Sequence, residues 1–193
     1  MRKWILAIIL ILGLAEFGYG TWIPAKAWLS QILLERAWTE SLETDQHHKP
    51  WPWADTWPVL RIQHEASNSD LLVLEGDSGQ SLAFGPGRMH MSTMPGQPGN
   101  TVISGHRDTH FSFLKRVKPG EVIIVSDRNY NKYYYIIKAI DIVDSRHNKL
   151  LINSQDDRLT LATCYPFDAL TAGGELRYIV SAIHTNEAKQ AVK

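Results

Sequence analysis

Short apolar runs separated by turn-forming residues occupy the chain from Val59 onward. The runs are rich in Val, Ile, Leu and Tyr, with Gly, Pro, Asn and Asp between them, a pattern typical of strands joined by turns. The strands predicted from this pattern span residues 59–63, 71–74, 81–84, 101–104, 121–126, 132–143, 159–164 and 177–184. Residues 111–117 have a short helical pattern instead. About eight short strands predict a mainly β domain, either a closed barrel or a sandwich.

The first 23 residues carry a different pattern, a nearly continuous apolar run that follows a basic start. Two interpretations are open. A basic start and an apolar core are typical of a secretory signal peptide. The alternative is a membrane-spanning helix, because Trp4 and Trp22 would lie about 27 Å apart, close to the thickness of the hydrocarbon layer. Glu16 counts against a span, since a carboxylate in lipid is costly. The tryptophan spacing favours an uncleaved anchor over residues 1–23.

The basic residues before this run predict its orientation. Arg2 and Lys3 would hold the amino terminus in the cytoplasm, because positive flanks stay on the cytoplasmic side of a membrane. We therefore expect a single-pass protein of the cytoplasmic membrane, with the body of the chain on the extracytoplasmic side.

Residues 24–57 form a tryptophan-rich segment between the apolar run and the first strand. All seven tryptophans lie within the first 57 residues, and apolar side chains at helical spacing predict a helix from Pro24 to about Leu42. This helix would either lie on the bilayer as a juxtamembrane helix or pack on the body as cover of its core. Residues 43–55 contain His47, His48 and two prolines and predict a polar linker. Residues 186–193 predict a polar tail.

The overall composition narrows the class of protein. The chain has 193 residues, of which 44% are hydrophobic and 21% charged, and its formal net charge is zero. These values fit one globular domain with an appendage. The zero net charge and the lack of a stripe of basic residues argue against nucleic acid as a partner. The chain has one cysteine. An internal disulfide and a structural zinc site built on thiolates are therefore both excluded.

That cysteine, Cys164, lies at the end of a predicted strand. Alternation along the strand places it on one face with Thr160 and Ala162, whose small side chains leave room for a substrate backbone above them. Pro166 ends regular pairing two residues later, so the thiol lies at a strand end. A lone cysteine is more often a small buried hydrophobic residue. An unpaired thiol outside the cytoplasm is open to oxidation, however, which favours a functional role.

A nucleophilic thiol needs a base, and acyl transfer needs donors for the oxyanion. His106 is the best candidate base, because it follows a buried-looking strand and a glycine that allows close backbone approach. Arg177 is the best oxyanion donor, because it opens the last strand after a flexible loop. Asp108 could orient the imidazole or simply turn the backbone. His110 is the second choice of base.

Three segments together resemble the signatures of sortases. Thr-Leu-Ala-Thr-Cys164 is similar to the sortase cysteine motif, Gly105-His106 to the histidine motif, and Arg177 in Leu-Arg-Tyr-Ile-Val to the arginine motif. The resemblance covers about residues 59–184. The run Gly-His-Arg-Asp-Thr-His-Phe and the tryptophan-rich residues 25–38 are most similar to the sortases of Gram-negative bacteria (class GN).

The resemblance implies an eight-stranded sortase-type β-barrel with a few short helices over residues 58–185. It implies a membrane-anchored cysteine transpeptidase. No cofactor and no metal-ligating residue is expected, and the dependence of activity on a metal stays open. Cys164 would attack the carbonyl after Thr in a C-terminal sorting signal like Leu-Pro-x-Thr-Gly on an exported protein. His106 would transfer protons to and from the amines, and Arg177 would hold the oxyanion. The expected substrate contacts are Ala162, Thr163, Asp108 and Phe167.

Other functions stay open from the sequence. The alternative from another class is a non-catalytic, membrane-anchored β-barrel that binds a partner and has Cys164 buried. Papain-like enzymes fit poorly because the chain has the order His, Cys, Arg. L,D-transpeptidase-type enzymes lack the Thr-Leu-Ala-Thr lead to the cysteine. The acceptor amine could be a cell-wall peptide, a pilin-like lysine or water. A subgroup of Gram-negative type would place the body in the periplasm.

Overall fold

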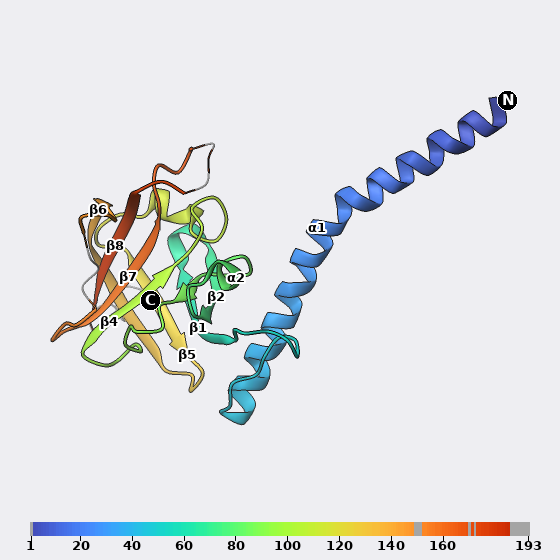
Figure 1. Ribbon diagram of the computed structural model, residues 1–193. Coiled ribbons are helices and arrows are strands. Elements are labelled where there is room, and N and C mark those ends of the chain that lie inside the picture. The colour runs from blue at the N-terminus through green and yellow to red at the C-terminus, as the bar shows by residue number, and fades with distance from the viewer. Residues whose placement is uncertain (1, 149–151, 170, 172, 186–193) are drawn as a thin grey trace.

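Eight strands close into a barrel in the order β1-β2-β3-β4-β7-β8-β6-β5 in the computed structural model (Figure 1). The structure describes residues 2–148, 152–169, 171 and 173–185, so the predicted tail at 186–193 lies outside it. The strands are β1 (Pro58–His64), β2 (Ser69–Glu75), β3 (Gly87–Arg88), β4 (Gly99–Ser104), β5 (Val122–Asp127), β6 (Lys132–Asp144), β7 (Asp157–Cys164) and β8 (Leu176–His184). The expected eight-stranded barrel is confirmed.

Two kinds of strand pairing bring distant segments together. Strands β4 and β7 run parallel, with Ser104 opposite Ala162, so their carboxyl ends lie at the same edge of the barrel. Strands β7 and β8 are antiparallel, and the start of β8 therefore lies beside the end of β7. The carboxyl ends of β4 and β7 and the amino end of β8 meet at one place.

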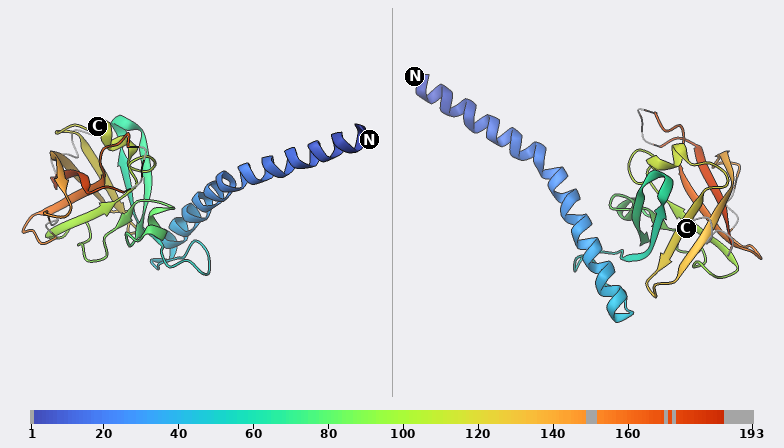
Figure 2. Two further views of the ribbon diagram at one scale, coloured as in Figure 1. Left: turned by 45° about the horizontal axis from the view of Figure 1, so that its top comes forward. Right: turned by 180° about the vertical axis from the view of Figure 1, so that it is seen from behind.

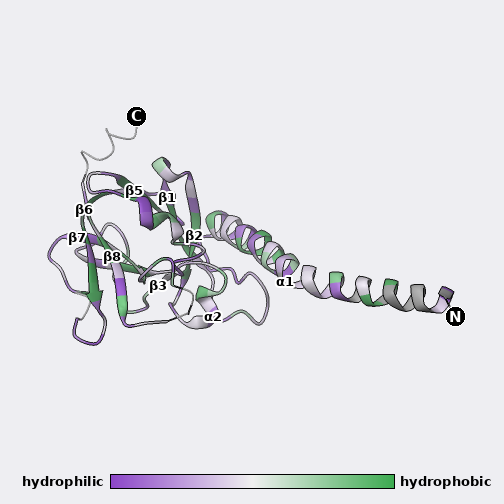
Figure 3. Cartoon of the chain, turned by 90° about the horizontal axis from the view of Figure 1, so that it is seen from above, coloured by the Kyte–Doolittle hydropathy of each residue, from purple (hydrophilic) through white to green (hydrophobic). Residues whose placement is uncertain are grey.

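Alternation along the strands separates the core from the outer surface. Leu159 and Leu161 of β7, Ile103 of β4 and Val180 of β8 are almost fully buried in one hydrophobic cluster inside the barrel. Figure 3 shows hydrophobic residues gathered on the strands and more polar residues in the connecting loops. The intervening side chains of β7 and β8 point outward, where they can form a binding surface.

The prediction for residues 81–84 was wrong. We expected a strand there, but residues Gly79–Leu82 form the short helix α2. The Ser78 side chain caps it by accepting a hydrogen bond from the Ser81 backbone N–H, which favours helix over strand. The strand that completes the barrel is the two-residue β3, too short to give an alternating pattern. The other short helical segments are η1 (Glu65–Ser67) and η2 (Ser112–Arg116).

One long helix, α1 (Arg2–Thr44), replaces the two separate segments expected at the amino terminus. It projects away from the barrel and bends along its length (Figure 2). Pro24 lies inside it, where the pyrrolidine ring removes a backbone hydrogen bond and kinks the helix without ending it. Within the described part of the chain, no helical stretch is long and apolar enough to span a bilayer. The structure therefore does not confirm the membrane span expected near residues 4–23.

The last turns of α1 pack on the barrel. Leu34 and Trp38 are buried against Leu72 and Leu74 of β2 in a second hydrophobic cluster. This is the covering role that the sequence offered as one of two alternatives. Trp28 lies within the helix predicted from Pro24 to about Leu42 but is 69% exposed, so the contact with the barrel begins after it.

Candidate active site

The three predicted functional residues come from the meeting point of β4, β7 and β8. Cys164 is the last residue of β7 and lies directly opposite Arg177 in the strand register. Ser104, the last residue of β4, is paired with Ala162 of β7. His106 lies two residues after Ser104, and Cys164 lies two residues after Ala162. Because β4 and β7 are parallel, His106 and Cys164 leave the sheet at equivalent levels and on the same edge. The structure thus brings together residues that are separated by most of the barrel sequence.

Gly105 sets the path of the chain from β4 to His106. Its backbone N–H donates to the Ala162 carbonyl at 3.1 Å, and its carbonyl accepts a hydrogen bond of 2.7 Å from the Thr163 hydroxyl. A Cβ atom at this position would lie 2.8 Å from the buried Phe111 ring. Only glycine therefore allows this close approach. The two hydrogen bonds tie the histidine segment to the cysteine strand.

An open groove of about 1160 Å³ contains the three side chains. Its floor includes the small residues Thr160 and Ala162, on the same face of β7 as Cys164. This agrees with the room above the strand that alternation predicts for a substrate backbone. Cys164 itself is half-buried and unpaired, so it is not sealed in the core as the non-catalytic alternative requires. The groove exceeds the size typical of small-molecule pockets, which suits an extended peptide.

Arg177 is fixed by the loop that precedes it. Its Nη1 donates to the carbonyls of Gly174 at 2.7 Å and Leu176 at 3.0 Å. A guanidinium carries five N–H donors in one plane, and these two bonds use the pair on Nη1. The Nε and Nη2 donors are those that could bind a carbonyl or an oxyanion beside Cys164.

The additional site residues predicted from the sequence have different surroundings. Thr163 is 3% exposed and its hydroxyl donates to the Gly105 carbonyl, but the residue also belongs to the lining of the groove, so the substrate contact expected of it stays a prediction. Phe167 packs on the core and on Tyr178, with ring centroids 5.0 Å apart, and it holds its loop to the barrel. Phe167 is only partly buried, and the substrate contact expected of it stays a prediction. Ala162 lines the groove floor as expected.

Asp108 and His110 form an electrostatic pair beside the groove. Burial lowers the pKa of the His110 imidazole, the nearby His106 lowers it further, and the Asp108 carboxylate partly offsets both effects. Asp108 is exposed and acts here on His110. The orienting contact with His106 stays a prediction. Among the described residues, no group of three His, Cys, Asp or Glu side chains could hold a metal ion.

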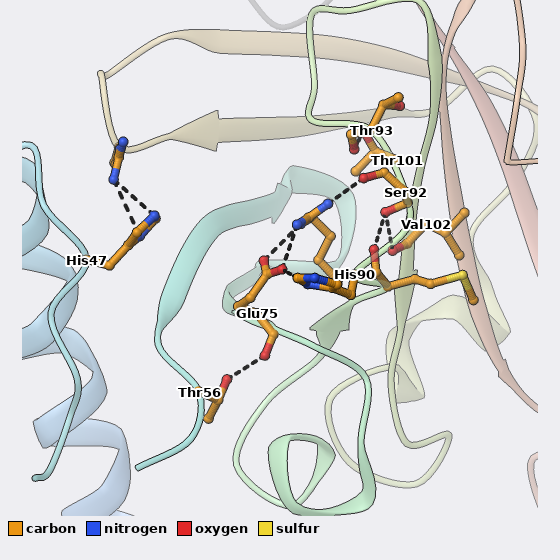
Figure 4. Close-up of polar contacts among 11 residues, drawn as sticks. His47, Thr56, Glu75, His90, Ser92, Thr93, Thr101 and Val102 are labelled. Atoms are coloured by element: carbon orange, nitrogen blue, oxygen red, sulfur yellow. Dashed lines mark hydrogen bonds and ion pairs between the residues drawn. The ribbon is translucent and has the colours of Figure 1, made fainter. Parts of the chain in front are cut away.

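A buried ion pair holds one wall of the groove in place. The Arg88 guanidinium of β3 donates to both carboxylate oxygens of Glu75 in β2, at 2.6 and 3.0 Å, and both side chains are nearly buried. His90 also contacts Glu75, at 2.9 Å, and the Thr56 hydroxyl donates to the Glu75 carbonyl (Figure 4). Met89, next to Arg88, lines the groove. The sequence did not predict this wall or its ion pair, because the two residues of β3 are too few to give a strand pattern.

Arg107 is a second residue that sequence reasoning missed. It lies next to His106, is 8% exposed, and donates hydrogen bonds to the carbonyls of Ala169 and Thr171 in the loop after Cys164. In the sequence it is one more charged residue in a polar loop, and charge usually indicates exposure. No signal in a single sequence separates it from a solvated arginine.

Comparisons with known proteins identify a family that this chain resembles. A sequence model of the sortase domain matches residues 62–185. Sortase D of Bacillus subtilis is 31% identical over 114 residues, which cover 58% of this chain and 57% of that protein. Sortase A of Listeria monocytogenes is 31% identical over 99 residues, covering 49% of this chain and 44% of that protein. The chain thus spans about half the length of the curated relatives it matches.

Solved structures share the fold. A Clostridium perfringens sortase D5 transpeptidase superposes with a TM-score of 0.66 at 20% identity, over 82% of this chain and 99% of that one. Sortase C1 of Streptococcus agalactiae gives a TM-score of 0.57 at 26% identity, over 65% of this chain and 66% of that one.

Proposed function

The chain belongs to the sortase family, whose members are cysteine transpeptidases, and we propose that it cleaves the sorting signal of an exported protein through a thioester on Cys164. The observation that carries the proposal is the register of the site. Cys164 lies opposite Arg177, and the parallel pairing of β4 and β7 brings His106 to the same edge, over an open groove with a small-residue floor.

The proposed reaction has two halves. The Cys164 thiol passes its proton to His106, and its sulfur attacks the carbonyl carbon of Thr in a signal like Leu-Pro-x-Thr-Gly, so that a carbon–sulfur bond replaces the carbon–nitrogen bond to Gly. His106 gives its proton to the leaving amine and later takes one from the incoming amine. The acceptor nitrogen then displaces the thiolate. In both halves Arg177 donates to the oxyanion, which is where fixed donors lower the barrier most.

Mass spectrometry and peptide cleavage test this function together. Wild-type protein with a fluorogenic Leu-Pro-x-Thr-Gly peptide should release the fluorophore and carry the acyl fragment as a mass adduct. Cys164→Ala should show neither, with an unchanged circular dichroism spectrum. Adding a glycine-based or lysine-based amine distinguishes transfer from hydrolysis by the mass of the product. Cleavage by Cys164→Ala at the wild-type rate would refute the assignment.

The proposal includes attachment to the cytoplasmic membrane through the amino-terminal part of α1. Its support is the apolar sequence of residues 4–23, with large exposed side chains such as Trp4 at 77%, Phe17 at 70% and Trp22 at 61% on a helix that leaves the barrel. The amino terminus would be cytoplasmic and the barrel extracytoplasmic, in the periplasm if the resemblance to the Gram-negative subgroup holds. Fractionation of cells that express the chain with and without residues 1–23 tests this. Equal recovery of both forms in the soluble fraction would contradict it.

A further inference from the structure

Arg107 buries a charge directly beside the proposed base. The side chain is 8% exposed, and its Nη2 donates to two backbone carbonyls, of Ala169 at 3.1 Å and of Thr171 at 2.6 Å. Its Nη1 is buried and has no hydrogen-bond partner among the described residues. A buried guanidinium is costly unless its donors are satisfied, so the two carbonyl bonds matter for this segment.

Both carbonyls belong to the connection between β7 and β8, which spans residues 165–175. They lie two residues apart in the sequence, and both accept hydrogen bonds from one nitrogen. Further along, Gly173 and Gly174 have φ values of 87° and 97°, a conformation that glycine adopts freely. Such a segment has little intrinsic preference for one path. Its conformation therefore depends on contacts with the barrel, which are the packing of Phe167 near its start and the Arg107 bonds further along.

The end of this loop in turn holds Arg177, through the 2.7 Å bond from Nη1 to the Gly174 carbonyl. We propose that Arg107 is a positioning residue, which fixes the β7–β8 connection to the histidine segment and thereby sets the placement of Arg177 relative to Cys164 and His106. This inference rests on the proposed function for its effect on catalysis. The tether itself is a property of the fold and can be tested without any substrate.

The Thr163–Gly105 bond and the Arg107 bonds act at different places. The threonine ties the strand of the cysteine to the end of β4, inside the barrel rim. The arginine ties the loop beyond the cysteine to the residue after the histidine. Removing Arg107 should therefore leave the strand pairing intact and free the loop alone. A residue that served only general stability would loosen the barrel as a whole.

Hydrogen exchange and steady-state kinetics on the full chain test the tether. Arg107→Met keeps the length of the side chain but removes its donors, and Arg107→Lys keeps the charge without the planar fork. Arg116→Met, at an exposed arginine of η2, is the matched control. In Arg107→Met the loop amides, including the Ala169 N–H bonded to the Pro166 carbonyl, should exchange at least ~10-fold faster, with β5 and β6 unchanged.

With a sorting peptide, Arg107→Met should lower kcat by ~10–100-fold and change KM less, because Arg177 acts in the transition state. Arg107→Lys should recover part of both losses, and Arg116→Met should equal the wild type. Unchanged loop exchange in Arg107→Met, or exchange that accelerates equally in all strands, would overturn the inference. If Arg107→Met does not fold, Arg107→Lys carries the same comparison. A wild type that cleaves no sorting peptide would refute the proposed function, and the exchange data would still decide the tether.

Discussion

Gly105→Ala is expected to displace the His106 segment without touching any group that takes part in the chemistry. The added Cβ would lie 2.8 Å from two ring carbons of Phe111 and 3.1 Å from a third. Unbonded carbon atoms prefer separations of about 3.5–4.0 Å, so either the ring or the backbone must move by about 0.7 Å or more. Phe111 is fully buried, and Gly105 is held by hydrogen bonds on both of its backbone groups. Neither side has free space to yield.

The size of the effect follows from this overlap. Overpacking in a well-packed core costs about 1–3 kcal/mol, which for a chain of this length lowers Tm by about 2–12 °C. A displacement near 1 Å at a reacting group costs about 100-fold in rate, so kcat/KM should fall by about 10–100-fold. Thermal unfolding followed by circular dichroism and cleavage of a fluorogenic sorting peptide measure the two effects.

Two companion variants isolate the cause. At Gly79 an added Cβ meets no heavy atom within 4 Å, so Gly79→Ala should change Tm and activity little. Phe111→Leu shrinks the obstructing ring, so Gly105→Ala should be less damaging in that background than in the wild type. Equal losses in both backgrounds would show that contact with Phe111 is not the cause. Wild-type activity of Gly105→Ala would refute the close-approach argument altogether.

Three further predictions concern charged groups. Arg177→Lys should lose about as much kcat/KM as Arg177→Ala, ~10²–10³-fold, because an ammonium lacks the planar fork; near-wild-type activity of the lysine variant would contradict the oxyanion role. Glu75→Gln should lower the free energy of unfolding by about 3–5 kcal/mol in urea titration, since it leaves the Arg88 charge buried and unpaired; a loss under about 1 kcal/mol would refute this. Because burial and His106 lower the pKa of His110, the unfolded chain binds that proton first, so stability should fall as pH drops below 6.5. His110→Gln should reduce the fall between pH 7.5 and pH 5, and an unchanged pH dependence would contradict it.

The strands of the barrel could be predicted from the sequence where they were long enough to alternate. Strand β7 has Leu159 and Leu161 on its inner face and was expected almost to the residue. Strand β3 has two residues and was missed, whereas residues 81–84 were apolar and wrongly expected to form a strand. Residues 79–82 form a helix because the Ser78 side chain accepts a hydrogen bond from the Ser81 N–H. The spacing of apolar residues does not indicate such a local bond.

The neighbours of each strand could not be predicted in the same way. Strands β4 and β7 are separated along the chain by β5 and β6, yet they pair in parallel and bring His106 to Cys164. A periodic pattern states which face of a strand is buried but not which strand lies beside it. The sequence predicts that His106 and Cys164 each lie at the end of a strand. That these two strand ends are neighbours follows only from the pairing of β4 with β7.

Thr163 shows how far alternation reaches within the site. The same alternation that places Cys164 with Thr160 and Ala162 places Thr163 on the inner face, so its burial followed from the sequence. Its position next to the nucleophile suggests a substrate contact, which stays a prediction, since the residue is buried yet belongs to the groove lining. The carbonyl of Gly105 that its hydroxyl meets could be identified only from the pairing of β4 with β7.

Arg107 marks the opposite limit. Its burial depends on two backbone carbonyls in a loop that the sequence describes only as flexible, and backbone acceptors leave no trace in side-chain composition. In other sequences, an arginine directly after a catalytic histidine at a strand end is therefore a candidate for this role. The candidate is stronger where the loop that follows the nucleophile contains glycines. The loop exchange rates of Arg107→Met and Arg116→Met test that reasoning directly, because both variants remove one arginine and only the first removes bonds to the loop.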